Sequence, residues 1–206
     1  EQWEKYADRA AKSIDALTGF SEAVIAREVA ANLPEGSTLF VSSSRPIRDL
    51  EGFGAPRSGV RTHANRGLAG IDGNISTALG IASASKQTFA VLGDLSFLHD
   101  LTGLIHREDI DCCFIVINND GGGIFSTLPQ RGVDGFESVF GTPHGLDPAA
   151  IAGAMGISAS TISSIDELKK VLKSPVKGIS IVVANVASRD ENADSLKAIY
   201  ESMNSI

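Results

Sequence analysis

The chain has 206 residues, of which 43% are hydrophobic and 21% are charged. This length favours one α/β domain, and the composition, which lacks a long apolar run, argues against a membrane span and against disorder. Lys and Arg number 18 against 25 Asp and Glu, giving a formal net charge of −7. With no basic tract in the sequence, we do not expect nucleic-acid binding.

The N-terminal part of the chain predicts two helices followed by a strand. Residues 1–33 carry apolar side chains at helical spacing, interrupted at Thr18-Gly19-Phe20. Ser21 is the candidate N-cap of the second helix, and Pro34-Glu35-Gly36 ends it. A short strand is predicted over residues 38–42, and it runs into small hydroxyl residues. A strand that ends in this way leaves room for a ligand.

Three further runs are apolar throughout and rich in β-branched residues, which is typical of strands covered on both faces. Helical patterns lie between and after these runs. The alternation predicts an α/β fold, a doubly wound and mostly parallel sheet with helices on both faces. The predicted strands span residues 88–92, 112–117 and 179–186, and the predicted helices span residues 74–85, 98–106, 148–155, 166–173 and 190–203.

Two other features bear on function and compartment. Residues 121–145 are glycine-rich and show no clear period, and a loop of that length inside a compact domain is usually functional. Cys112 and Cys113 are neighbours in a predicted strand, where a bridge between them would be badly strained, so they are expected to be buried thiols. No secretion leader is recognised. A reducing, cytoplasmic setting is therefore expected.

Polar residues follow two of the predicted strands. Gly93-Asp94-Leu95-Ser96 opens a helical pattern, and Asn119 lies in a polar stretch that runs into three glycines. One crossover fits between Asp94 and Asn119, so both side chains are expected at adjacent strand ends, where α/β sheets bind ligands. Mg²⁺ accepts carboxylate, amide, carbonyl and phosphate oxygens, and a helix N-terminus favours phosphate. Alternatively, the Gly-Asp pair merely turns the chain and caps a helix.

These residues resemble the diphosphate-and-magnesium motif of thiamine-diphosphate enzymes, a Gly-Asp followed one crossover later by Asn-Asn. Further blocks resemble the MenD family, the 2-succinyl-5-enolpyruvyl-6-hydroxy-3-cyclohexene-1-carboxylate synthases of menaquinone synthesis. The resemblance covers at least residues 39–130 and implies the thiamine-diphosphate-binding fold. The blocks that carry it span residues 46–49, 64–73, 93–101, 118–125 and 126–129.

The resemblance implies roles for residues around the cofactor. Mg²⁺, or Mn²⁺ in its place, would be held by the side chains of Asp94 and Asn119 and by the carbonyl of Gly121. Ile71 matches the apolar wedge that bends the cofactor, although by itself it would pass for core packing. The implied cofactor-binding set is Gly93, Asp94, Leu95, Ser96, Ile71, Gly121 and Ile124.

Substrate contacts are implied as well. Arg48 and Arg66 match arginines that recognise substrate carboxylates, and both are expected in loops beside the cleft, where a guanidinium binds a carboxylate through two hydrogen bonds. Solvated surface arginines are the alternative reading. Ser44 matches a position near the substrate, and Phe125 and Leu128 match apolar residues that cover it.

The four histidines, His63, His99, His106 and His144, form no zinc-ligand spacing. His99 falls on a predicted helix and is expected to be structural.

The implied activity is the decarboxylation of 2-oxoglutarate and the addition of the succinyl carbanion equivalent to isochorismate. Residues 1–206 would form the diphosphate and magnesium domain, with residues 1–36 as helices leading into it. The family's pyrimidine-binding and middle domains, and the glutamate that activates the cofactor, are not expected in this chain, which therefore holds no catalytic residue of that kind. A pyrimidine-binding domain of the same or a second subunit, in a homo-oligomer, would complete the site.

Two alternatives remain open at this point. The isolated chain could be an inactive cofactor-binding and assembly module, or it could belong to another thiamine-diphosphate decarboxylase or synthase.

Overall fold

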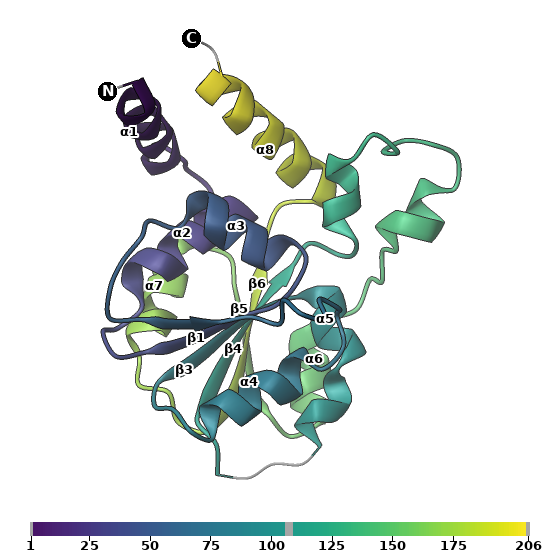
Figure 1. The fold of residues 1–206 in the computed structure, drawn as a ribbon. Coiled ribbons are helices and arrows are strands. Elements are labelled where there is room, and N and C mark those ends of the chain that lie inside the picture. Colours follow the sequence, from purple (N-terminus) through teal and green to yellow (C-terminus); the bar gives the residue numbers. More distant parts are fainter. Residues whose placement is uncertain (1, 106–108, 205–206) are drawn as a thin grey trace.

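The computed structural model describes residues 2–105 and 109–204. Its centre is a six-stranded sheet in the order β2-β1-β3-β4-β6-β5, and every neighbouring pair of strands is parallel. The strands fan out through the middle of the molecule (Figure 1). The predicted parallel α/β fold is thus confirmed. The strands are β1 Thr38–Val41, β2 Arg61–His63, β3 Thr88–Gly93, β4 Cys112–Asn118, β5 Ser158–Ile162 and β6 Ile179–Asn185.

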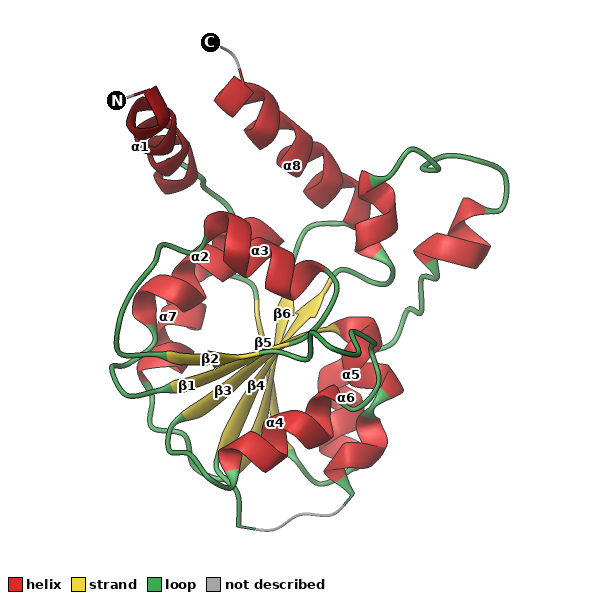
Figure 2. Ribbon diagram, in the orientation of Figure 1, coloured by secondary structure: helices red, strands yellow, loops and turns green. Residues whose placement is uncertain are grey.

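Helices cover both faces of the sheet, as predicted. In Figure 2, α2, α3 and α7 lie on one side of the strands and α4, α5 and α6 on the other. Ser21 caps α2 through its side chain, which accepts a hydrogen bond from the amide of Val24. The helices are α1 Gln2–Asp15, α2 Glu22–Asn32, α3 Arg45–Phe53, α4 Asn74–Ala82, α5 Asp94–His99, α6 Pro148–Ala154, α7 Ile165–Lys173 and α8 Arg189–Asn204.

Each face of the sheet has its own hydrophobic core. On one face, Ile25 of α2 and Leu168 of α7 pack with Ile115 of β4 in one cluster. On the other face, Ile75 of α4 and Phe114 of β4 belong to a second cluster. Successive residues of β4 therefore serve opposite cores, which is why the strand is apolar throughout rather than alternating. The adjacent thiols Cys112 and Cys113 are free and buried, as predicted.

Two strands and one α-helix of the described residues were not predicted. Strands β2 and β5 form the two edges of the sheet and are short and largely exposed, so they lack the apolar runs that mark the central strands. Helix α3 begins directly after β1 with Pro46 in its first turn. It has only nine residues, so the charged segment shows no extended helical period.

The predicted helix over residues 98–106 is wrong in its bounds. Helix α5 starts at Asp94, directly at the end of β3, and a 3-10 helix over Leu101–Leu104 follows it. Residue 106 itself lies outside the described part of the chain. The early start matters because it places the Asp94 carboxylate in the first turn of α5 rather than in a loop before it.

The glycine-rich loop 121–145 holds two short helical turns, Gly123–Thr127 and Glu137–Gly141. Helices α1 and α8 project away from the sheet on one side (Figure 1), and residues of both join α2 and α3 in a third apolar cluster. Within residues 2–105 and 109–204, none of the helices is long and apolar enough to cross a membrane.

Candidate functional site

The sheet order brings the ends of β1, β3 and β4 together. From β1 the chain first adds β2 on one side and then crosses to β3 on the other, so the direction of winding reverses between β1 and β3. Ligands of α/β sheets bind outside the carboxyl ends of strands at such a point. A cleft of about 260 Å³ opens there and is called the strand-end cleft below. It is lined by residues 43–46, 71, 93–96, 119 and 121–125.

The strand-end cleft gathers every residue of the predicted cofactor and metal sets, along with Ser44 and Phe125. Arg48, Arg66 and Leu128 do not line it. All three are exposed, and Arg48 lies on α3 rather than in the loop that was expected, so that expectation was wrong. Helix α3 starts immediately after β1 and has Pro46 in its first turn. Arg48 therefore lies one helical turn into α3, and its Nη1 donates a hydrogen bond to the carbonyl of Ser44 at 2.8 Å.

Asp94 is only 2% exposed, and its carboxylate is held from two sides. Oδ1 accepts a hydrogen bond from the amide of Leu95 at 2.7 Å. Oδ2 accepts from the amide of Gly121 at 2.9 Å and lies 3.2 Å from Nε2 of His144. The end of β3 is thus tied to the loop that follows β4, and the carboxylate is fixed at the cleft.

Asn119 presents an unsatisfied oxygen. Its Nδ2 donates to Oε1 of Glu22 at 2.5 Å, whereas its Oδ1 is buried and has no hydrogen-bond partner within the described part of the chain. Buried amide oxygens in folded proteins are nearly always paired, so this one needs an explanation. A hard cation at the cleft would supply the missing partner.

Three successive glycines let the loop after β4 pass close to other backbone. A Cβ on Gly121, whose φ is +132°, would lie 2.2 Å from the carbonyl oxygen of Gly141. One on Gly122 would lie 2.1 Å from the carbonyl oxygen of Phe140, and one on Gly123 would lie 2.4 Å from Nδ2 of Asn119. None of these positions accepts a side chain without a shift in its neighbours, so the glycines are needed to form this wall of the cleft.

Ser96 and Asn74 hold the segment that carries Ile71. Nδ2 of Asn74 donates to Oγ of Ser96 at 2.9 Å, and that hydroxyl donates to the carbonyl of Ile71 at 3.2 Å. Both polar residues are buried, while the Ile71 side chain is 38% exposed at the rim of the cleft. Its exposure contradicts plain core packing and leaves an apolar side chain available to a ligand.

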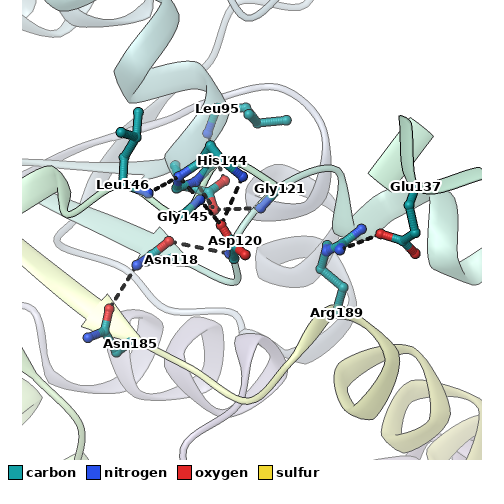
Figure 3. Close-up of polar contacts among 11 residues, drawn as sticks. Leu95, Asn118, Asp120, Gly121, Glu137, His144, Gly145, Leu146, Asn185 and Arg189 are labelled. Carbon is teal, nitrogen blue, oxygen red and sulfur yellow. Dashed lines mark hydrogen bonds and ion pairs between the residues drawn. The ribbon is translucent and has the colours of Figure 1, made fainter. Parts of the chain in front are cut away.

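No role for His144 or Asp120 was predicted from the sequence, yet the two lie together close to Gly121 (Figure 3), and His144 contacts the Asp94 carboxylate. The amides of His144 and Gly145 donate to Oδ1 of Asp120 at 3.0 and 2.8 Å, and the Gly145 hydrogen bond is the main cause that lowers the pKa of Asp120. The amide of Leu146 donates to Nδ1 of His144, so the proton of a neutral imidazole sits on Nε2, facing Asp94.

A buried charged group lies beside the cleft. Arg45, which lines it, contacts the carboxylate of Glu22 and forms an ion pair with Asp49 one helical turn away. Burial raises the pKa of Asp49 to about 7, although the charge of Arg45 acts in the opposite direction. The other carboxylate oxygen of Asp49 is buried without a partner in the described residues.

The donor set fits magnesium better than zinc. The candidate ligands are a carboxylate, an amide oxygen and a backbone carbonyl, which are all hard oxygen donors. Among the residues that the structure describes, no group of three His, Cys, Asp or Glu side chains is placed to hold a metal ion. The unpartnered Oδ1 of Asn119 is the observation that favours a cation.

Similarity to known proteins extends over most of the chain. Residues 52–186 match the family model "Thiamine pyrophosphate enzyme, C-terminal TPP binding domain". The chain is similar to the 2-succinyl-5-enolpyruvyl-6-hydroxy-3-cyclohexene-1-carboxylate synthase of Thermobifida fusca, at 45% identity over 167 residues, 77% of this chain and 30% of that protein. The synthase of the same name from Myxococcus xanthus is 42% identical over 191 residues, 89% of this chain and 32% of that protein.

The chain thus spans about a third of the length of these relatives. Among solved structures, it is similar to benzoylformate decarboxylase from Polynucleobacter necessarius, with a TM-score of 0.59 and 20% identity over 80% of this chain and 33% of that one. At this identity the likeness concerns the fold.

Proposed function

The chain belongs to the thiamine pyrophosphate enzymes as their C-terminal cofactor-binding domain, and from this premise we propose that it is the diphosphate half of a 2-succinyl-5-enolpyruvyl-6-hydroxy-3-cyclohexene-1-carboxylate synthase. The similarity to the Thermobifida fusca and Myxococcus xanthus synthases, which extends over most of this chain, supports the proposal. The reaction is the decarboxylation of 2-oxoglutarate and the addition of the succinyl unit to isochorismate. In the proposed enzyme, residues 1–206 form the diphosphate and magnesium domain, and residues 1–36 lead into it.

The unpartnered amide oxygen of Asn119 is the observation that carries the metal assignment. We assign Mg²⁺ to Asp94, Asn119 and the carbonyl of Gly121, with Mn²⁺ as a substitute. We assign Leu95 and Ser96, in the first turn of α5 beside the same cleft, to the diphosphate. The amide of Ser96 suits this role, whereas that of Leu95 already donates to Asp94. When bound, thiamine diphosphate supplies an electron sink for the decarboxylation. Asp94, Asn119 and Gly121 would hold the cation, whose charge would offset the repulsion between the Asp94 carboxylate and a phosphate group.

Apolar side chains of the cleft hold the organic part of the cofactor in this proposal. Ile71, fixed through its carbonyl by Ser96, would act as the wedge that bends the cofactor, and Ile124 would shield the cofactor from water. Phe125, also in the cleft, would cover the substrate. Ser44, at the start of α3, is assigned to substrate. Arg48, Arg66 and Leu128 lie outside the cleft and are assigned to the two acidic substrates at its mouth.

The proposed site is completed by a pyrimidine-binding domain, from the same chain or from a second subunit of a homo-oligomer. Exposed apolar side chains support a partner there, since Leu68 is 93%, Ile71 38% and Leu128 40% exposed. The glutamate that activates the cofactor is assigned to that partner, so we expect no turnover by the isolated chain. We place the enzyme in a reducing cytoplasm, where its two buried cysteines remain thiols.

Removal of the proposed carboxylate ligand tests the metal site. Asp94→Ala leaves two of the three protein ligands, so the affinity for thiamine diphosphate should no longer depend on Mg²⁺. Calorimetric titration of the cofactor with and without Mg²⁺ measures this dependence. Asp134→Ala, which removes an exposed carboxylate from the loop after β4, is the control and should behave like the parent chain. If cofactor binding by the Asp94→Ala variant depends on Mg²⁺ as strongly as binding by the parent chain does, the proposed metal site is refuted.

A further inference from the structure

Glu22 lies behind the proposed metal site although its position in the sequence, 97 residues before Asn119, gives no sign of it. It is the first residue of α2 and is 5% exposed. A carboxylate this deeply buried requires hydrogen-bond partners, because burying a polar group without partners costs free energy. The partners of Glu22 are the amide of Asn119 on one oxygen and the guanidinium of Arg45 on the other.

The chemistry of the pair fixes the orientation of Asn119. The amide of Asn119 turns its NH₂ group toward Oε1 of Glu22, and that oxygen accepts its hydrogen bond at 2.5 Å. Its oxygen then faces the other way, and this Oδ1 is the buried atom without a partner in the described residues. The same amide turned by half a rotation would place two N–H donors where the oxygen now lies, and donors repel a cation.

Neighbouring elements hold Glu22 in place. Nε of Arg45 lies 3.4 Å from Oε2 of Glu22, and Arg45 is itself paired with Asp49. The backbone amide of Glu22 donates to Oδ1 of Asn192 on α8 at 3.2 Å. Gly123 leaves room for the pair, because a Cβ there would come within 2.4 Å of Nδ2 of Asn119 and 3.5 Å of Oε1 of Glu22.

We propose that Glu22 is a positioning residue that orients the Asn119 amide, so that its oxygen and not its nitrogen faces the divalent cation. The inference rests on the function proposed above. Glu22 itself contacts neither metal nor cofactor in this proposal. Partners that orient a metal ligand typically change metal affinity by about 10- to 100-fold when they are removed.

The same helix offers a matched control. Glu28 is also buried, at 7% exposed, and its Oε2 also accepts a hydrogen bond from an asparagine amide, Nδ2 of Asn32 at 2.9 Å. It is paired with an arginine as well, Arg27, at 2.7 Å. Neither Glu28 nor Asn32 lines the strand-end cleft. A change at Glu28 therefore removes a similar interaction from α2 without touching the proposed metal ligand.

The experiment compares Glu22→Ala, Glu22→Gln and Glu28→Gln with the parent chain. Mg²⁺ is titrated calorimetrically in the presence of thiamine diphosphate, and Mn²⁺ binding is followed by electron paramagnetic resonance. Thermal unfolding without metal reports stability separately. We expect the apparent metal Kd to rise about 10- to 100-fold for Glu22→Ala. Glu22→Gln should fall between that variant and the parent, because a glutamine can face Asn119 with either its oxygen or its nitrogen.

The results separate this inference from the proposed function. Glu28→Gln should lower only the unfolding temperature and leave the metal Kd unchanged. Parent-like metal affinity in both Glu22 variants, or an equal loss of affinity in Glu28→Gln, would overturn the role of Glu22. If Glu22→Ala does not fold, the metal Kd of Glu22→Gln alone decides whether Glu22 has this role. A parent chain whose cofactor binding ignores Mg²⁺, or which is unaffected by Asp94→Ala, would overturn the proposed function and this inference with it.

Discussion

Gly121→Ala should disrupt the wall of the strand-end cleft. The added Cβ would lie 2.2 Å from the carbonyl oxygen of Gly141 and 2.9 Å from that of Thr142. Both obstacles are backbone, so no side-chain rotation relieves the contact, and the two loop segments must move apart. The backbone of Gly121 also has a φ of +132°, which residues with a side chain rarely adopt.

The expected loss of stability has three parts. The unfavourable φ costs about 1 to 3 kcal/mol. The movement breaks the hydrogen bond from the amide of Gly121 to Asp94, at 2.9 Å, and the one from the amide of Gly122 to Gly141, at 2.7 Å. A hydrogen bond to a charged group contributes about 1.5 to 3 kcal/mol and a neutral one about 1 kcal/mol. Alanine also reduces the conformational freedom of the unfolded chain, which offsets up to about 1 kcal/mol of this loss. The unfolding free energy should therefore fall by about 3 to 6 kcal/mol.

Gly132→Ala is the matched control. Gly132 lies in the same loop with a φ of +83°, but a Cβ there would have no atom within 4 Å. Gly132→Ala should therefore lose only the cost of the unfavourable φ, about 1 to 3 kcal/mol. The reduced freedom of the unfolded chain offsets up to about 1 kcal/mol of this loss, as in Gly121→Ala. Urea unfolding followed by far-ultraviolet circular dichroism measures both variants, and calorimetry measures cofactor binding with Mg²⁺. Equal loss of stability in the two variants, with cofactor binding intact in Gly121→Ala, would refute the close approach described here.

Two further predictions concern the charged residues around the cleft. The pKa of Asp49 is about 7 in the folded chain against a usual 3.8, so the folded state binds this proton more tightly and loses stability as pH rises from about 4 through 7. Asp49→Asn should remove a decline of up to about 4 kcal/mol between pH 4 and 8, measured by urea unfolding, and an unchanged pH profile would contradict the assignment. In the full-length protein, Arg48→Ala or Arg66→Ala should raise the KM for one acid by about tenfold or more, because a charge-assisted hydrogen bond contributes about 1.5 to 3 kcal/mol. Steady-state kinetics with 2-oxoglutarate and isochorismate test this, and unchanged KM values for both acids in both variants would exclude the arginines.

The central strands and the meeting of Asp94 with Asn119 were predictable from sequence. Strands buried on both faces need apolar side chains at every position, so β3 and β4 appear as uninterrupted runs. The residue that follows each strand must then lie at the same edge of the sheet. For this reason both side chains line one cleft. The local sequence and the rule for connections between parallel strands suffice to predict this.

The residues that support these side chains were not predictable in the same way. His144 approaches Asp94 across 50 positions of sequence, from a loop with no regular period. Glu22 looks like an ordinary acidic residue in the first turn of a helix, where a negative charge is favourable in any case. Edge strands β2 and β5 were missed because exposed strands need no apolar pattern. Contacts made only by the folded loops leave no signal in a single sequence.

The uniformly parallel sheet also affects how the chain reaches this fold. Parallel neighbours cannot be joined by a tight hairpin, so even the nearest pairings connect distant positions, such as Ser158 with Ser180. Cys112 pairs with Ile179 across a longer separation still. Closing such long loops before any contact forms is entropically costly, and non-local pairing slows folding. We therefore expect this domain to refold slowly for its size. The pairing of β4 with β6 should be among the last to form.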